Sequence, residues 1–184
     1  MKKGWLLLAA GLMIILAGCS KYDKSHYHIN NRIPVKELAI SIEMKLKELH
    51  ELHYKDAEAV DPENVNPYYQ VWDIKEPDLE DRFAPITDFN IEKIVTGFVI
   101  QPTLANQDSE LILVLEVKND EAGQDLEKSM KKLKAYQDYV WEDYIPRQHE
   151  FVKGNKIEKQ GNFLLYATSQ YAEEVVKLFQ FKVQ

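Results

Sequence analysis

Residues 110–118 read Glu-Leu-Ile-Leu-Val-Leu-Glu-Val-Lys, a largely aliphatic segment. Successive side chains of a β-strand point to opposite faces of a sheet, so alternate residues share a face. Here both sets are apolar: Ile112 and Val114 lie on one face, and the other face carries Leu111, Leu113, Leu115 and Val117. A strand that is apolar on both faces is typical of the centre of a sheet. The stretch therefore predicts a central strand spanning Glu110 to Lys118.

The chain before this strand predicts a helix and a second strand. From Pro34, apolar residues recur at spacings of three and four, the period of a helix with one buried face. The members of that face are Val35, Leu38, Ala39, Ile42, Leu46, Leu49 and Leu52. Pro34 suits the first helical turn, where its missing N–H group costs nothing. Ile91 to Ile100 is rich in β-branched residues and predicts the second strand.

The chain after the central strand predicts a helix, a hairpin and a last helix. Asn119 or Asp120 can cap the helix, and Pro146 is expected to end it. Its predicted buried stripe is Leu126, Met130, Leu133, Tyr136, Val140 and Tyr144. Strands at 156–160 and 163–168 flank Gly161-Asn162, a pair typical of a tight turn with positive φ. Ser169 can cap a last helix.

These elements predict an α+β fold with a four-stranded, mostly antiparallel sheet and helices packed on one face. The expected order is helix, strand, strand, helix, strand, strand, helix. Between the first helix and the first strand lies a segment, residues 54–89, that we expect to be an irregular loop. Its four prolines exclude a long helix. The loop is long for a structureless connection, so we expect it to pack on the core or to carry function.

The N-terminus resembles a bacterial lipoprotein signal. Lys2 and Lys3 precede a short apolar run that ends in Leu16-Ala17-Gly18-Cys19. This run is too short to span a bilayer and has the form of a secretion signal. The ending resembles a lipobox, in which the Cys thiol takes a lipid and the chain is cleaved before it. We expect a signal peptide at 1–18, a tether at 19–33 and a single domain at 34–184.

The lipid on Cys19, carrying fatty acids such as palmitate, would hold the protein on the extracytoplasmic face of the cell membrane. The alternative is an ordinary signal peptide in which Cys19 is incidental. Cys19 is the chain's one Cys, so no disulfide is expected. The formal net charge is −7, which argues against nucleic acid as a partner, because such binding needs clustered Lys and Arg.

The second half of the chain resembles a family of small Gram-positive lipoproteins known as domain of unknown function 4358. The resemblance covers roughly residues 79–182. It rests on Glu116-Val117-Lys118, the helix start at 120–125, Ala135-Tyr136, Pro146, Glu150, Lys153, Asn155 and Lys159-Gln160-Gly161-Asn162. The family implies no activity that can be assigned to particular residues.

Residues with catalytic or metal-binding chemistry are present without the spacing that such chemistry needs. His50 and His53 stand one residue too close for the metalloprotease helix motif, so we expect His26, His28, His50 and His53 to be exposed and no metal to be bound. No serine has the Gly-x-Ser-x-Gly context of a nucleophile elbow, and no glycine-rich phosphate loop occurs. We expect no cofactor and no catalysis.

Aromatic residues are the best candidates for a binding surface. Tyr and Trp offer a flat apolar body with a polar tip, which suits sugars and peptides. The candidates are Tyr68, Tyr69 and Trp72 in the expected loop, and Tyr139 and Trp141 in the long helix. The structural alternative is that Tyr136, Val140 and Tyr144 pack on the sheet, with Tyr139 and Trp141 under the loop.

The expected function is therefore a non-catalytic, lipid-anchored envelope protein that binds a protein or cell-wall partner. The alternative is a hydrolase of envelope polymers that uses carboxylates of the expected loop. The acids concerned are Asp61, Glu63, Asp78, Glu80 and Asp81. A calcium loop is disfavoured because these acids lack the turn glycine that such a loop needs.

Overall fold

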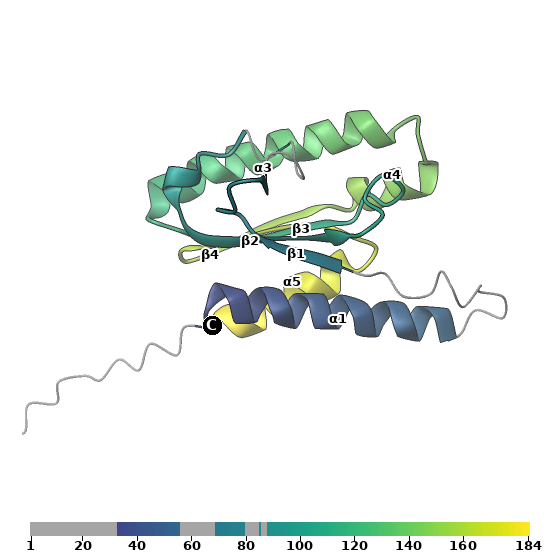
Figure 1. Cartoon of the computed structure of the whole chain (residues 1–184), viewed down its shortest axis with the longest axis horizontal. Coiled ribbons are helices and arrows are strands. Elements are labelled where there is room, and N and C mark those ends of the chain that lie inside the picture. Colours follow the sequence, from purple (N-terminus) through teal and green to yellow (C-terminus); the bar gives the residue numbers. More distant parts are fainter. Residues whose placement is uncertain (1–32, 56–68, 80–84, 86–87) are drawn as a thin grey trace, which may run out of the picture. The chain divides into compact units, whose positions relative to one another are not determined.

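The computed structural model describes residues 33–55, 69–79, 85 and 88–184, all within one compact unit. Its centre is β3 (Leu111–Val117), formed by the stretch that is apolar on both faces. The sheet is open and antiparallel, with the order β1-β2-β3-β5-β4 (Figure 1). The other strands are β1 (Tyr69–Asp73), β2 (Ile94–Pro102), β4 (Lys156–Gln160) and β5 (Phe163–Thr168). The predicted central position of β3 is confirmed.

Helices cover both faces of this sheet (Figure 1). On one face, α3 (Asp120–Trp141) buries Leu126, Met130 and Leu133 against the odd-numbered side chains of β3. On the other face, α1 (Val35–Lys55) and α5 (Ala172–Val183) pack on Ile112 and Val114. The prediction of helices on one face is therefore wrong. A strand with two apolar faces needs a cover on each, because both must be removed from water.

The sheet has five strands rather than the four predicted, and the additional strand is β1. It lies inside the segment 54–89 that was expected to be an irregular loop, and it pairs with the end of β2. It has only five residues, lies at the sheet edge and is half-buried, with Val71 exposed. A short edge strand between prolines carries little periodicity, so its sequence predicts a loop. The observed order therefore has an additional strand, β1, between the first helix and β2.

The local signals around the strands are largely confirmed. The turn between β4 and β5 places Gly161 at φ +57, as the Gly-Asn pair predicts. Asn119 caps α3 through its side chain, which accepts a hydrogen bond from the Ala122 N–H group at 2.9 Å. The predicted strand at 91–100 instead begins with a short helix, η3 (Ile91–Lys93), before β2. Asn90 caps that turn by accepting from the Glu92 N–H group.

The buried stripe of α3 differs from the prediction beyond Leu133. The buried residues continue at intervals of four, to Gln137 and Trp141, whereas Tyr136 and Tyr144 are exposed. Tyrosine is more apolar than glutamine, so the sequence pattern predicts Tyr136 at the buried position. Gln137 is buried instead because its amide forms hydrogen bonds with residues of the sheet. Tyr136 therefore lies on the exposed side of α3.

Two predicted helix boundaries are also corrected. The helix α3 ends at Trp141, and Pro146 is the first residue of a further helix, α4 (Pro146–Lys153). Proline suits that position because its missing N–H group has no partner in the first turn. Ser169 was expected to cap the last helix, but Tyr171 is the residue before α5. Among the described helices, none combines the length and apolarity needed to cross a membrane.

Candidate functional site

Buried polar side chains gather at one end of the sheet. Here β1 and β3 begin and β2 and β5 end, since Tyr69 pairs with Pro102 and Leu111 pairs with Thr168. We call this the polar end; it lies on the right in Figure 1, beside α4. The opposite end, where Gly161 turns the chain between β4 and β5, we call the hairpin end. The polar end carries a buried carboxylate on one face of the sheet and a buried amide on the other.

The buried carboxylate is Glu110, whose residue is 4% exposed. Ser169 donates a hydrogen bond to its Oε1, and Tyr69 donates one to its Oε2. The His50 Nε2 atom lies 3.3 Å from the same Oε2. These partners come from α1, β1 and the segment after β5, so one carboxylate joins three distant parts of the chain. A buried charge is tolerated where hydrogen bonds replace water in this way.

His50 is buried, which corrects the expectation that it is exposed. It is 5% exposed and packs edge-on against Tyr171, with ring centroids 4.9 Å apart. The spacing contains a signal for this burial, since Ile42, Leu46 and His50 follow one another at intervals of four. The sequence also indicates the face of Glu110, because Glu110 stands two residues before Ile112 and alternate residues of a strand share a face. His53 is exposed as expected.

Burial and the neighbouring Glu110 carboxylate raise the pKa of the Tyr69 phenol, so this residue donates a hydrogen bond rather than carrying a charge. The Ser169 hydroxyl is directed at Glu110 and not at His50, and it also accepts a hydrogen bond from the Tyr171 N–H group. Nucleophilic catalysis needs an accessible hydroxyl beside its base. Ser169 is buried, so the Glu110 cluster is suited to holding the fold together.

The buried amide belongs to Gln137, on the α3 side of the sheet. Its Oε1 accepts hydrogen bonds from Tyr166 at 2.6 Å and Thr168 at 2.7 Å. Its Nε2 donates to the Ser109 carbonyl at 2.9 Å. The Ser109 hydroxyl and N–H group in turn bind Gln148 of α4. This network fixes the last turns of α3 and the start of α4 on the ends of β3 and β5.

A cavity of about 210 Å³ lies beside this network. Its polar lining includes Asp108, Ser109, Glu110 and Gln137, and its aromatic lining is Tyr136 and Trp141. The volume is below the roughly 300 Å³ at which pockets for drug-sized ligands begin. It therefore suits one side chain or another small group of a larger partner.

Asp108 is the acidic side chain of the cavity wall that is half-exposed rather than buried. Its Oδ1 accepts a hydrogen bond from the Glu110 N–H group at 2.8 Å. Burial raises the pKa of the Asp108 carboxyl, and the Glu110 carboxylate adds to that effect, while the Glu110 N–H group, His50 and Arg147 oppose it. The charged carboxylate is thus only partly compensated by its surroundings.

The aromatic residues predicted as a binding surface do not lie together. Tyr69 packs on the α1 side of the sheet and Trp72 on the α3 side. Trp141 is 6% exposed, whereas Tyr139 is 82% exposed. Tyr68 and Cys19, the predicted site of lipid attachment, lie outside the described residues.

Three tyrosines at and just after the end of α3 are exposed, whereas the sequence favoured Tyr139 and Trp141 as binding candidates and, in the structural alternative, packed Tyr136 and Tyr144 on the sheet. Tyr136 is 54% exposed and Tyr144 is 59% exposed, beside the more exposed Tyr139. Tyr136 also lines the cavity, and Tyr144 packs against Trp141 with ring centroids 5.6 Å apart. We call Tyr136, Tyr139 and Tyr144 the tyrosine rim. The sequence would have indicated that Tyr136 is exposed only if Gln137 had been predicted to occupy the buried face of α3.

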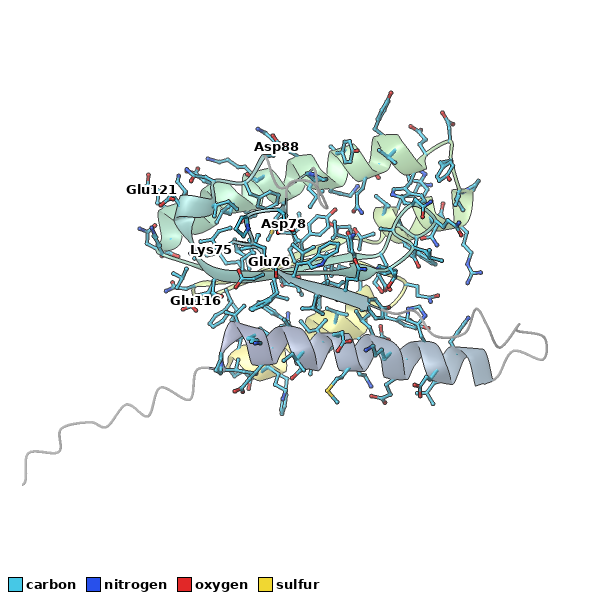
Figure 2. The ribbon with its side chains drawn as sticks, in the orientation of Figure 1. Lys75, Glu76, Asp78, Asp88, Glu116 and Glu121 are labelled. Carbon is cyan, nitrogen blue, oxygen red and sulfur yellow. The ribbon has the colours of Figure 1, made fainter. Side chains whose placement is uncertain are left out.

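The carboxylates proposed for a hydrolase fall mostly outside the described residues: Asp61, Glu63, Glu80 and Asp81. Asp78 is described; it is exposed and follows β1 on the α3 side of the sheet (Figure 2). In the described part of the chain, no group of three or more His, Cys, Asp or Glu residues could hold a metal ion.

Comparison with known proteins gives one match. Residues 87–169 match the family described as Domain of unknown function (DUF4358). This range contains β2, β3, α3, α4, β4 and β5, and with them the Gln137 network and the residues that line the cavity, except Pro85. No curated protein and no solved structure matches the chain. His50, Tyr69 and α1 lie outside the matched range.

Proposed function

Because residues 87–169 belong to the family of domain of unknown function 4358, we propose a function from this chain's own chemistry. The protein is a lipid-anchored extracytoplasmic protein that binds a protein or cell-wall partner and does not catalyse a reaction. The observation that carries the binding role is the tyrosine rim beside a cavity at the polar end. The anchor rests on the sequence around Cys19.

The anchor follows from the lipobox-like ending of the apolar N-terminal run. A diacylglyceryl group on Cys19 would bury many methylene groups, each contributing about 0.8 kcal/mol to membrane binding. The test is metabolic labelling with palmitate of the full chain and of a Cys19→Ala variant. Label in the wild type and none in the variant is expected. Equal labelling of both proteins would remove the anchor from the proposal.

The binding surface follows from the exposure of the tyrosine rim. Monomeric proteins rarely keep several large aromatic side chains exposed together, and tyrosine is enriched at sites of protein and sugar recognition. One member of the rim, Tyr136, lines the cavity of about 210 Å³, which suits one anchoring group of a partner. Tyr139, at 82% exposure, contributes little to the fold and is free to contact a partner.

The absence of catalysis is supported by how the polar side chains are used. Ser109 and Gln137 bind each other and neighbouring elements, and Ser169 is bound to Glu110. Catalytic groups need access to substrate together with a base or acid in reach. Turnover of an envelope polymer that is abolished by a conservative change in one carboxylate would contradict this part of the proposal.

The test of the binding surface is photo-crosslinking of the full chain in its own membrane. A photo-crosslinking amino acid is placed at position 139 and, as a matched control, at position 95. Val95 is 46% exposed on β2, toward the hairpin end. We expect a discrete adduct from position 139 and none from position 95. Protease and glycosidase digestion then tell a protein partner from a cell-wall partner. Adducts from both positions, or from neither, would contradict the proposal.

A further inference from the structure

The cavity at the polar end has an apolar side and a carboxylate. Leu111, Leu133 and Val140 line one part of it, and Asp108 lines another. The apolar side chains suit methylene groups, because removing these from water is favourable. The carboxylate suits a group with a positive charge. One ligand group must therefore combine an aliphatic chain with a cation.

Three other polar residues of the wall, Gln137, Ser109 and Glu110, have their hydrogen-bonding groups engaged within the protein, whereas Gln101 at the wall offers a neutral amide. Gln137 holds Tyr166, Thr168 and the Ser109 carbonyl, and Ser109 is bound to Gln148. The Glu110 carboxylate is occupied by Ser169, Tyr69 and His50 on the opposite face of the sheet. Asp108 differs from these, because only its Oδ1 accepts a hydrogen bond from another described residue.

The charge of Asp108 lacks a close counter-ion among the described residues, where no ion pair joins it to a basic side chain. The nearby Glu110 carboxylate repels it, and Arg147 on α4 is exposed and has the smallest of the opposing influences. The pKa of the Asp108 carboxyl is raised, first because burial removes the carboxylate from water and then because of the Glu110 carboxylate. A cation in the cavity would relieve that cost, and the net charge of −7 favours its approach.

We propose that the cavity binds a protonated primary amine on an aliphatic chain, with Asp108 as its counter-ion. This rests on the proposed binding function and names the chemistry of the anchoring group. An ammonium fits better than a guanidinium, because a guanidinium binds a carboxylate best through both oxygens. Here Oδ1 already accepts from the Glu110 N–H group, and Oδ2, which accepts from no other described residue, can face one compact ammonium group. Tyr136 and Trp141 also line the cavity, and aromatic rings attract a cation placed over them.

The experiment is an NMR titration of the full chain in detergent with three blocked amino acids. N-acetyl-lysine methylamide carries the ammonium, the norleucine analogue has the same chain without the charge, and the arginine analogue carries a guanidinium. The Trp141 indole N–H and the Ser109 and Glu110 amides report on the cavity. We expect the lysine probe to bind about tenfold or more tightly than the norleucine probe, with the arginine probe between them.

The Asp108→Asn variant is the matched control. Asparagine keeps an oxygen that accepts from the Glu110 N–H group, so the variant is expected to fold, and removing a poorly compensated charge raises stability at neutral pH. The lysine probe should then bind no better than the norleucine probe. A Glu121→Gln variant, which removes an exposed acid at the hairpin end, should leave the preference intact.

Equal binding of the lysine and norleucine probes to the wild type would overturn the proposal. So would a lysine preference that survives Asp108→Asn, or shifts confined to residues outside the cavity. The crosslinking at position 139 separates this failure from that of the proposed function. An adduct there without amine selectivity leaves a binding surface with different chemistry. If there is no adduct from position 139 and no preference for the lysine probe, both the proposed binding function and the proposed amine site are contradicted.

Discussion

The two ends of the sheet are built by different kinds of interaction. At the hairpin end two features are local in sequence, since Gly161 turns the chain at φ +57 and Asn119 caps the helix that follows β3, and the long-range contacts there include ion pairs of partly exposed side chains such as Lys159–Asp120. Its charged groups lie at the surface, as Glu116 and Glu121 do in Figure 2. The polar end is held by residues far apart in sequence. His50 and Glu110 are 60 residues apart, and Ser169 and Glu110 are 59 apart.

This difference says where the fold depends on single side chains. At the hairpin end, the cap and the turn each contribute about 1 kcal/mol to the free energy of unfolding, and one can be removed without affecting the other. At the polar end, removing one member of a buried network leaves the others without partners, which costs more than the bond itself. The same end carries the cavity and the tyrosine rim. The demanding part of the fold and the candidate binding site therefore coincide.

The largest effect is expected at Glu110. Glu110→Ala leaves the hydroxyls of Ser169 and Tyr69 and the ring of His50 without their common acceptor, and we expect the free energy of unfolding to fall by about 3 kcal/mol. Urea denaturation followed by circular dichroism measures this. Glu110→Gln keeps the shape and one acceptor, so its loss should be smaller. A loss from Glu110→Ala no greater than that of the hairpin-end variants would break the comparison.

Gln137 should come next. Gln137→Leu keeps the volume but leaves Tyr166 and Thr168 without an acceptor, at a cost of about 2 kcal/mol. Adding Tyr166→Phe to this variant removes one of the stranded hydroxyls. The two changes together should therefore cost less than the sum of each alone in a double-mutant cycle. Strict additivity would mean that the network is not coupled.

Alkaline pH should weaken the polar end in particular. Burial raises the pKa of both Tyr69 and Tyr166 above the usual 10.0. In the unfolded chain these phenols ionise near pH 10, whereas the folded state keeps them neutral, so the unfolded state binds fewer protons and stability falls as pH rises beyond 10. Denaturation midpoints between pH 8 and pH 11, values chosen to bracket that of free tyrosine, measure the fall. Tyr69→Phe should make it shallower, and an unchanged slope would contradict the burial argument.

The hairpin end should show smaller losses. Gly161→Ala forces an alanine into the left-handed region, and no other atom lies within 4 Å of the added Cβ, so the cost is conformational and about 1 kcal/mol. Asn119→Ala removes the cap of α3 and should also cost about 1 kcal/mol. Thermal unfolding of both variants and their combination is the check. Because the sites share no network, the losses should add, and a coupling well above 0.5 kcal/mol would contradict local closure.

The smallest effect on stability is expected at the tyrosine rim. Tyr139→Ala changes a side chain that is 82% exposed, so the free energy of unfolding should move by less than about 0.5 kcal/mol. Its effect should appear in partner binding instead. A large loss of stability would mean that the ring packs on the fold, and the rim would then lose its most accessible member.

The same comparison explains how much of the structure could be predicted. The central place of β3, the turn at Gly161 and the cap at Asn119 follow from patterns within a few residues, and each is confirmed. The two apolar faces of β3 also implied helices on both sides, an implication that the predicted one-faced arrangement did not use. Strand β1 was missed because only its pairing with β2 distinguishes five half-buried residues from a loop.

The candidate site could not be predicted because its members are selected by the fold. Nothing local to Gln137 indicates that a glutamine would replace a tyrosine on the buried face of α3; its partners Tyr166 and Thr168 are 29 and 31 residues away in sequence. The predicted aromatic surface mixed residues of opposite sheet faces for the same reason. The spacing of His50 and the parity of Glu110 carry a signal for their burial that the prediction of an exposed His50 did not use, and neither signal indicates that the two side chains meet.

Binding of a partner at the polar end is best tested by hydrogen–deuterium exchange of the full chain in its native membrane, compared with the chain extracted into detergent. Peptides covering residues 103–110 and 133–145 report on the polar end, and peptides covering 156–164 report on the hairpin end. If a partner binds at the tyrosine rim and cavity, exchange in the native membrane is slower for the polar-end peptides and unchanged for the hairpin end. Equal exchange of the polar-end peptides in both states, or protection confined to the hairpin end, would contradict the account.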